Sequence, residues 1–167
     1  MKFNVLIIFI VNLFLLMVPV KSVFALEHTQ KDGLFSMDIP DGWHWVEFPE
    51  QVIVTYPDGK TMAIDIEFMP SKKISQTDIK QALKASDDKM ITEGIKTHKG
   101  VLEDNKEIKF DGAYATQLDF QSSIQNPIYV TYISFFNKGY VYTITYGDRD
   151  DKVRLLMEDA VATFKFR

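Results

Sequence analysis

The sequence of 167 residues contains no cysteine. Without cysteine the chain can form no disulfide framework, no thiolate nucleophile and no metal site with cysteine ligands. The absence also excludes lipid attachment of the kind found in exported bacterial lipoproteins, which require a cysteine as the first mature residue. The missing cysteine therefore excludes disulfides, cysteine catalysis, cysteine-ligated metals and lipid attachment.

An excess of basic residues is also lacking. Lys and Arg number 19 and Asp and Glu number 23, which gives a net charge of −4. Proteins that bind nucleic acid neutralise its phosphates with clustered lysines and arginines. An acidic chain has no such electrostatic footprint, so nucleic acid is excluded as a partner.

Histidine is scarce, with three residues at His28, His44 and His98. They fall in the opening segment, a predicted strand and a predicted loop, and no two have the spacing of metal ligands. The acidic run from Asp148 to Asp151 lacks the glycine and distal glutamate of an EF-hand, and Arg149 would repel a cation. We interpret that run as a helix cap, and expect no metal and no cofactor.

Signatures of catalysis are missing as well. The sequence contains no Gly-x-Ser-x-Gly elbow, no phosphate-binding glycine loop and no dinucleotide fingerprint. Asp65 and Glu67 emerge on one strand face and could form an acid–base pair, but their alternation with Ile64 and Ile66 predicts solvent exposure. We therefore expect no catalytic residue and no enzyme.

The sequence opens on a long apolar run. Lys2 precedes the segment from Val5 to Val18, in which Asn12 is the one polar residue, and Pro19 ends it. A basic residue followed by an apolar segment of this length is typical of a secretory signal peptide. Residues 1–25 are therefore predicted to direct export, which makes the protein periplasmic or secreted.

Val23 and Ala25 occupy the small-residue positions of a signal-peptidase site, which predicts cleavage between Ala25 and Leu26. The alternative is a retained anchor, because the apolar run approaches the roughly 17 residues that a short membrane span needs. Contact with a membrane is expected only in that case. Removing 25 of the 167 residues leaves 142, which suits a single domain over residues 26–167. Two lysines and no acid would be lost, so the net charge would become −6.

Period-two alternation predicts the first strands of the mature chain. The alternating stretches are 35–39, 52–56 and 62–68, and the turn sequences Pro40-Asp41-Gly42 and Pro57-Asp58-Gly59-Lys60 follow the first two. Proline fixes one backbone angle and glycine tolerates a positive one, so both sequences favour tight turns. The second turn predicts a hairpin.

A helix is predicted next. Ser75 and Asp78 have the spacing of a capping box at its start, and Gly94 is the expected stop. Residues that share one helical face follow the cap: Ile79, Leu83, Ser86 and Met90. The helix should therefore cover one face of a sheet.

Strand patterns then return until a second helix. They are weak over 101–103 and 108–110 and clear over 114–120, and a polar loop is predicted over 121–127. Strands 128–136 and 140–146, joined by Asn137-Lys138-Gly139, are apolar on both faces and should form a central hairpin. A helix is predicted to follow, with Val153, Leu156, Met157, Ala160 and Phe164 at helical spacing. The alternation over 163–167 predicts a short strand or an extended tail against the core.

The second hairpin is crowded with aromatic residues: Tyr129, Tyr132, Phe135, Phe136, Tyr140, Tyr142 and Tyr146. We interpret them as core rings whose hydroxyl groups reach the rim. An exposed aromatic surface for a partner protein is the alternative.

Four sequence stretches in this order resemble the PsbP-like superfamily, which includes the extrinsic PsbP subunit of photosystem II and DcrB-like exported bacterial proteins. They are Phe35–Pro40 followed by Gly42-Trp43, Asp111–Ala115, Tyr140–Tyr146 and Thr163–Phe166, and the resemblance spans residues 33–166. It implies an α+β sandwich in which helices flank a central antiparallel sheet of about six or seven strands, after the signal peptide. It also implies a protein that binds or assists other proteins and does not catalyse a reaction.

The leading hypothesis is a non-catalytic accessory protein that binds another protein of the bacterial envelope. Trp43, His44 and Trp45 after the first turn are its candidate contact surface, although Trp43 also reads as a residue that packs over the end of the sheet. One alternative is a carrier that holds a small apolar ligand between sheet and helix. Another is a hydrolase, for which Asp65, Glu67 or His44 would have to converge in a cleft.

Overall fold

The structure is a computed structural model, and it describes residues 25–69, 74–98, 100–122 and 127–167. The predicted signal peptide up to residue 24 and most of the predicted polar loop lie outside the described residues. Within them the elements follow in the order β1 (Ala25–Thr29), β2 (Phe35–Pro40), β3 (His44–Phe48), β4 (Gln51–Thr55), β5 (Thr61–Phe68), α2 (Gln76–His98), β6 (Gly100–Phe110), β7 (Ala113–Ser122), β8 (Tyr129–Asn137), β9 (Tyr140–Asp148), α3 (Asp151–Ala162) and β10 (Lys165–Phe166).

The strands form two sheets. The main sheet has seven strands in the order β3-β4-β5-β9-β8-β7-β6, and every neighbouring pair in it is antiparallel. The small sheet has the order β1-β2-β10. The predicted α+β fold with a large antiparallel sheet is confirmed, and β9 is its middle strand, as the apolar pattern of the second hairpin predicted.

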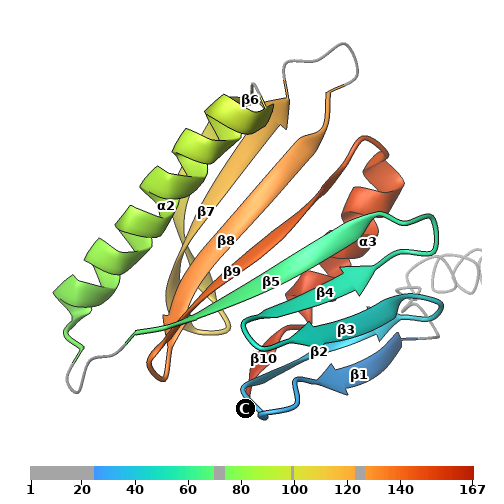
Figure 1. The fold of residues 1–167 in the computed structure, drawn as a ribbon, viewed down its shortest axis with the longest axis horizontal. Helices are drawn as coiled ribbons and strands as arrows, with labels where there is room; N and C mark the ends of the chain where they lie inside the picture. Colours follow the sequence, from blue (N-terminus) through green and yellow to red (C-terminus); the bar gives the residue numbers. More distant parts are fainter. Residues whose placement is uncertain (1–24, 70–73, 99, 123–126) are drawn as a thin grey trace, which may run out of the picture.

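The two helices lie on opposite faces of the main sheet, each over a different part of it (Figure 1). Helix α2 packs on β6, β7 and β8, whereas α3 packs on β9 and on β2 of the small sheet. Among the described residues, therefore, no helix covers the β3–β5 half of the face that carries α2. The opposite face is covered by α3 and the small sheet.

The core lies between the main sheet, α3 and the small sheet. Phe35 and Met37 of β2 are fully buried there, against a cluster that includes Ile64 of β5 and Ile144 of β9. Aromatic rings continue this core to the end of the chain, in contacts among Phe35, Phe110, Phe135, Tyr142, Phe164 and Phe166. The interpretation of the second hairpin as core is confirmed for its buried rings, Phe135, Tyr142 and Tyr146, while Tyr129 is exposed.

Helix α2 begins at the predicted capping box. The Ser75 hydroxyl oxygen accepts a bond from the Asp78 N–H at 3.1 Å, and the Asp78 carboxylate accepts one from the Ser75 N–H at 2.8 Å. The predicted stop at Gly94 is wrong, because the helix continues to His98. One glycine inside a helix costs only about 1 kcal/mol, which sheet packing readily offsets.

Three other elements differ from the sequence patterns. The polar opening segment, for which the sequence predicts no helix or strand, forms β1 along β2. The two weak stretches after Gly100 are one strand, β6, with a bulge between Leu102 and Asp104. Phe164 lies beyond the end of α3 and not on its face, whereas the short strand predicted after it is present as β10, which pairs with Phe35 and Ser36.

Candidate functional site

The aromatic corner after β2 faces the protein interior. Gly42 has a positive φ of 81°, as the turn sequence predicted, and delivers Trp43 to the core. Trp43 is only 8% exposed, and its ring meets Tyr56 edge-on with 5.2 Å between centroids. Trp45 is half-buried on the same side, stacks on His28 at 5.6 Å and donates its indole N–H to Glu47 at 2.7 Å.

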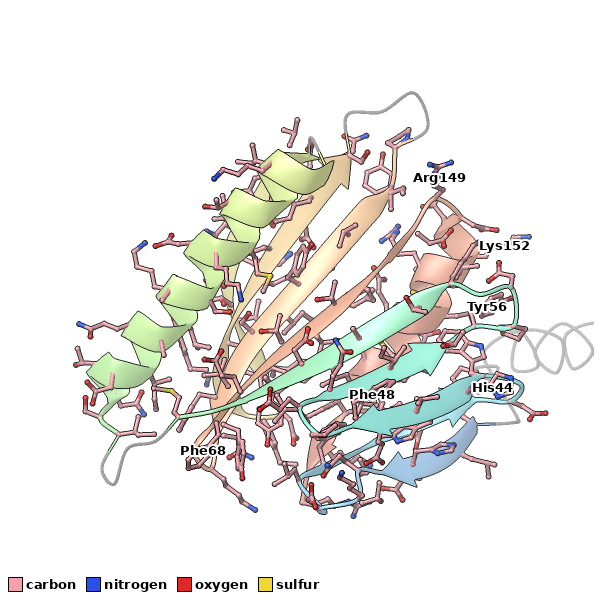
Figure 2. All side chains as sticks on the ribbon, in the orientation of Figure 1. His44, Phe48, Tyr56, Phe68, Arg149 and Lys152 are labelled. Atoms are coloured by element: carbon pink, nitrogen blue, oxygen red, sulfur yellow. The ribbon has the colours of Figure 1, made fainter. Side chains whose placement is uncertain are left out.

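His44 points to the opposite face, because side chains alternate along a strand. It is exposed, and Phe48 lies further along the same strand (Figure 2). Val46 and Phe48 are 44% and 47% exposed. Ile53 of β4, directly opposite Val46 in the ladder, extends this row onto the next strand. We call these four residues the β3–β5 face, since they belong to the half of the sheet that α2 leaves uncovered.

The carboxylates proposed for a hydrolase also lie on this uncovered side. Asp65 accepts a hydrogen bond from the Gln51 amide at 2.6 Å, and Glu67 is exposed. His44 is opposite Thr55, which is four residues along β4 from Gln51, the partner of Asp65. Four residues of strand span about 13 Å, so the structure does not bring these three groups together.

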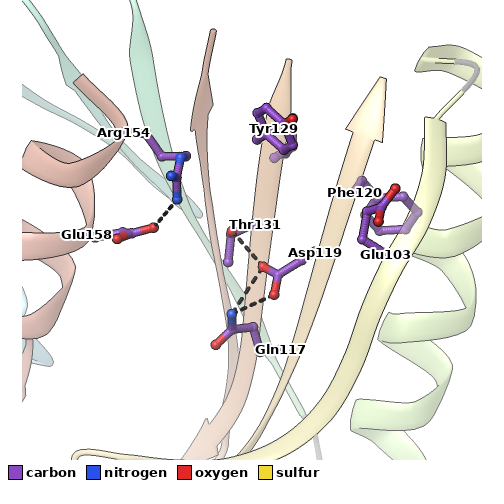
Figure 3. A pocket seen from close by; sticks show the side chains of 9 residues that line it. Glu103, Gln117, Asp119, Phe120, Tyr129, Thr131, Arg154 and Glu158 are labelled. Atoms are coloured by element: carbon purple, nitrogen blue, oxygen red, sulfur yellow. Dashed lines mark hydrogen bonds and ion pairs between the residues drawn. The ribbon is translucent and has the colours of Figure 1, made fainter. Parts of the chain in front are cut away.

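A polar cleft of about 280 Å³ lies on the other face, between α3 and strands β6 to β8 (Figure 3). We call it the α3 cleft. It is lined by Glu103, Gln117, Asp119, Phe120, Tyr129, Val130, Thr131, Arg154 and Glu158. The bulge in β6 leaves Glu103 outside the ladder register, and bulges commonly re-aim a side chain in this way.

The acids of the α3 cleft are engaged by donors of the protein itself. Asp119 accepts bonds from Thr131 at 2.7 Å and from Gln117 at 2.9 Å, and Glu158 accepts one from Arg154 at 2.7 Å. Beneath them, burial raises the pKa of Tyr146 to about 12. The acids of the cleft are thus hydrogen-bonded, while the buried Nε of Arg154 has no hydrogen-bond partner among the described residues. A cleft lined by charged and polar groups is a poor match for an apolar ligand.

A second cleft, of about 250 Å³, lies where the turn between β1 and β2 meets the ends of β5 and β9. We call it the Phe68 cleft. Its lining combines aromatic, apolar and acidic side chains: Gln30, Asp32, Leu34, Pro49, Glu50, Ile66, Phe68 and Tyr140.

The acidic run before α3 is a helix cap, as predicted. The Asp150 side chain accepts the Lys152 N–H at 2.9 Å, and Asp148 forms an ion pair with Lys60 at 3.1 Å. Among the described residues, no group of three or more His, Asp or Glu side chains is placed to hold a metal ion. No helix in the described part of the chain is both long and apolar enough to cross a membrane.

Comparison with solved structures identifies the fold. The solution structure of cyanobacterial PsbP (CyanoP) from Synechocystis sp. PCC 6803 matches with a TM-score of 0.62 and 17% identity, over 89% of this chain and 96% of that chain. The fold is PsbP-like. The resemblance seen in the sequence is thus confirmed at the level of the fold.

A crystal structure of a protein from Bacteroides thetaiotaomicron VPI-5482 also matches this fold, with a TM-score of 0.58 and 14% identity. That match covers 84% of this chain but 48% of the other, so this chain corresponds to about half of that protein. No protein-family model and no curated protein matches the sequence. These comparisons therefore show a PsbP-like fold and assign a role to no residue of the chain.

Sequence reasoning missed both clefts because each collects residues from separate elements. The α3 cleft joins positions from Glu103 to Glu158, and the Phe68 cleft joins positions from Gln30 to Tyr140. Phe68 continues the alternation of Met62, Ile64 and Ile66, which predicts that it is buried. It is instead 62% exposed, because the core ends before the strand does, so the local pattern gave no sign of the Phe68 cleft.

Proposed function

We propose that this protein is a non-catalytic, exported accessory protein that binds another protein of the bacterial cell envelope. The observation that carries the proposal is the β3–β5 face. It presents Val46 and Phe48 to solvent on a half-sheet that no helix of the described structure covers.

Exposed large apolar side chains that gather on one surface mark interaction sites, whereas scattered ones need no explanation. Val46, Phe48 and Ile53 are neighbours across two paired strands, so they form one surface. Polar groups border it, among them Gln51 and Asp65, which are hydrogen-bonded to each other. An apolar centre with a polar rim is the usual composition of a protein interface.

The candidate contact residues divide between two roles in this proposal. His44 belongs to the contact surface, because it shares the exposed row of β3. Trp43 and Trp45 hold β3 against Tyr56, His28 and Phe35 from below, and so keep the row in place. The likeness to PsbP-like proteins, including the DcrB-like exported group, supports the class of accessory protein and names no partner.

Site-specific photocrosslinking tests the proposal. A photoreactive residue replaces Phe48 in the full chain, made at its native level in the native organism, and Leu155 is replaced in a matched control. Leu155 is 52% exposed on α3, away from the β3–β5 face. Position 48 should give a discrete crosslink to one envelope protein that position 155 does not give. Equal or absent crosslinks from both positions would reject the proposal.

A further inference from the structure

The Phe68 cleft has an aromatic wall that the core leaves uncovered. The ring of Phe68 lies 5.3 Å from that of Tyr140, tilted by 56°, and the two residues are paired across β5 and β9. Phe68 is 62% exposed, although it occupies the face on which Ile64 and Ile66 are buried. An aromatic face open to solvent attracts a cation through the ring quadrupole.

Two carboxylates stand at this aromatic wall. Asp32 comes from the turn between β1 and β2, and Glu50 comes from the turn between β3 and β4. No lysine or arginine is among the residues that line the cleft. The site therefore carries two negative charges beside two rings, a combination that suits a positively charged group.

The acidic rim is held in place by a buried glutamine. Gln30 is 2% exposed, and its side-chain oxygen accepts the backbone N–H groups of Asp32 at 3.0 Å and Leu34 at 3.3 Å. Its side-chain N–H₂ donates to the Asp32 carboxylate at 3.1 Å. These bonds fix the turn and orient one carboxylate before any ligand arrives, which lowers the entropic cost of binding.

The size of the cleft favours a single side chain over a free metabolite. Pockets for small-molecule ligands usually measure about 300–1,000 Å³, and this one measures about 250 Å³. It is also built from surface turns, where a protruding residue of another protein can reach it. The floor of Leu34, Pro49 and Ile66 suits the methylene stem of a long side chain.

The α3 cleft provides a contrast within the same molecule. It is also acidic, but Arg154 lines it and donates a hydrogen bond to Glu158. A cation there would meet a resident guanidinium. The Phe68 cleft offers a cation both a free approach and an aromatic surface.

We propose that the Phe68 cleft binds the guanidinium or ammonium group of an arginine or lysine side chain presented by the partner protein. This step rests on the proposed function, since it assigns chemistry to the partner. The cation lies against Phe68 and Tyr140 and is paired with Asp32 and Glu50.

Binding of a model side chain is measured by NMR on the ¹⁵N-labelled protein, purified as cells export it. Acetyl-arginine amide is the probe, and acetyl-citrulline amide is its neutral control of the same length. Saturable shifts of the Gly33 and Phe68 amide signals are expected with arginine only, and they should weaken as salt is added. Shifts that are absent, or equal for both compounds, would overturn the proposal.

Variants locate the site. Phe68→Ala should weaken arginine binding by about two- to fivefold, the usual size of an exposed cation–π contact. Glu50→Gln should weaken it as well, whereas Glu103→Gln in the α3 cleft should leave it unchanged. All three positions are exposed, so thermal melts should show folded proteins. Loss of binding in Glu103→Gln alone would place the cation elsewhere and refute the assignment.

Two further experiments identify the source of the cation and distinguish this proposal from the proposed function. Free agmatine carries the same guanidinium without a peptide unit, and tighter binding of agmatine than of acetyl-arginine amide would contradict a polypeptide source. Photocrosslinking from position 48 is repeated in the Glu50→Gln, Phe68→Ala double variant. A weakened crosslink supports the cleft as part of the interface. An undiminished crosslink refutes the cleft but leaves the proposed function standing.

Discussion

The hydroxyl of Thr116 donates a hydrogen bond of 2.9 Å to the carboxylate of Asp87 and so ties α2 to β7. Both side chains are buried, and Asp87 is only 7% exposed. Burial raises the pKa of Asp87, while the bond from Thr116 acts in the opposite direction. The packing of α2 therefore depends on the protonation of one carboxyl group.

The sign of that dependence can be tested. Because the pKa of Asp87 is raised in the folded state, its favourable contribution is complete below the ordinary value of 3.8 and is lost as pH rises through the raised pKa. Asp87→Asn keeps an acceptor for Thr116 but cannot ionise. Urea unfolding at several pH values should show the variant gaining stability relative to the parent as pH rises from 3.8 through the raised pKa of Asp87. A difference independent of pH would contradict this role, and Asp88→Asn on the exposed side of α2 should change less.

Two tyrosines should ionise late. Burial raises the pKa of Tyr142 and of Tyr146 to about 12, whereas an ordinary tyrosine titrates near 10. Ultraviolet titration of the native protein should therefore show a late phase to which Tyr142 and Tyr146 contribute, and burial raises the pKa of Tyr114 as well. Stability from Tyr142 and Tyr146 is present below pH 10 and lost as pH rises to about 12, so alkaline unfolding should accompany the late phase. Tyr142→Phe and Tyr146→Phe should each reduce the amplitude of that phase.

At Gly147 the neighbouring backbone leaves no space for a side chain. A Cβ added there would lie 2.1 Å from the carbonyl oxygen of Tyr129 and 2.8 Å from the Cα of Val130, both backbone atoms that cannot swing away. Gly147→Ala should lower the free energy of unfolding by about 1–3 kcal/mol or more, as overpacking does. Gly59→Ala is the control, since Gly59 has a positive φ but open space around it, and should cost about 1 kcal/mol. Similar losses in both variants would contradict a steric cause.

A substitution in the aromatic corner should lower stability, whereas a substitution on the β3–β5 face should weaken partner binding. Trp43→Ala removes a buried ring and should cost about 3–5 kcal/mol in chemical denaturation. Phe48→Ala removes a half-exposed ring and should change stability by about 0.5 kcal/mol, while reducing capture of the envelope partner. A stable Trp43→Ala protein, or a Phe48→Ala protein that captures its partner normally, would contradict this division.

The amino end offers a prediction about processing. The expected cleavage site lies inside β1, where Ala25 and Leu26 pair with Pro40 and Ile39. A peptidase needs an extended, accessible substrate, so cleavage must precede the pairing of β1 with β2. Intact-mass measurement of the exported protein should give a chain that begins at Leu26, and Ala25→Arg should leave the longer chain. A mature protein of full length would support the retained anchor.

Local signals explain which elements could be predicted from the sequence. Turn residues such as Gly42 and Gly59, the Ser75–Asp78 cap and strict alternation act over a few residues, and the structure contains each of them. The small sheet could not be predicted, because β2 finds β10 about 130 residues away and no local pattern encodes that pairing. The β3–β5 face could not be predicted for a similar reason. The alternation of His44, Val46 and Phe48 indicates a strand, but only the position of α2 shows that this side of the strand is uncovered.

The central strand of the small sheet takes one neighbour from each end of the domain. β2 pairs with β1, which precedes it, and with β10 at the carboxyl end, where Arg167 bonds to Ser36 and pairs with Glu27. The small sheet is consequently incomplete until Lys165 and Phe166 have been synthesised. Closure of this side of the core therefore waits for a strand made about 130 residues after its partner, which leaves one edge of β2 unpaired during most of translation.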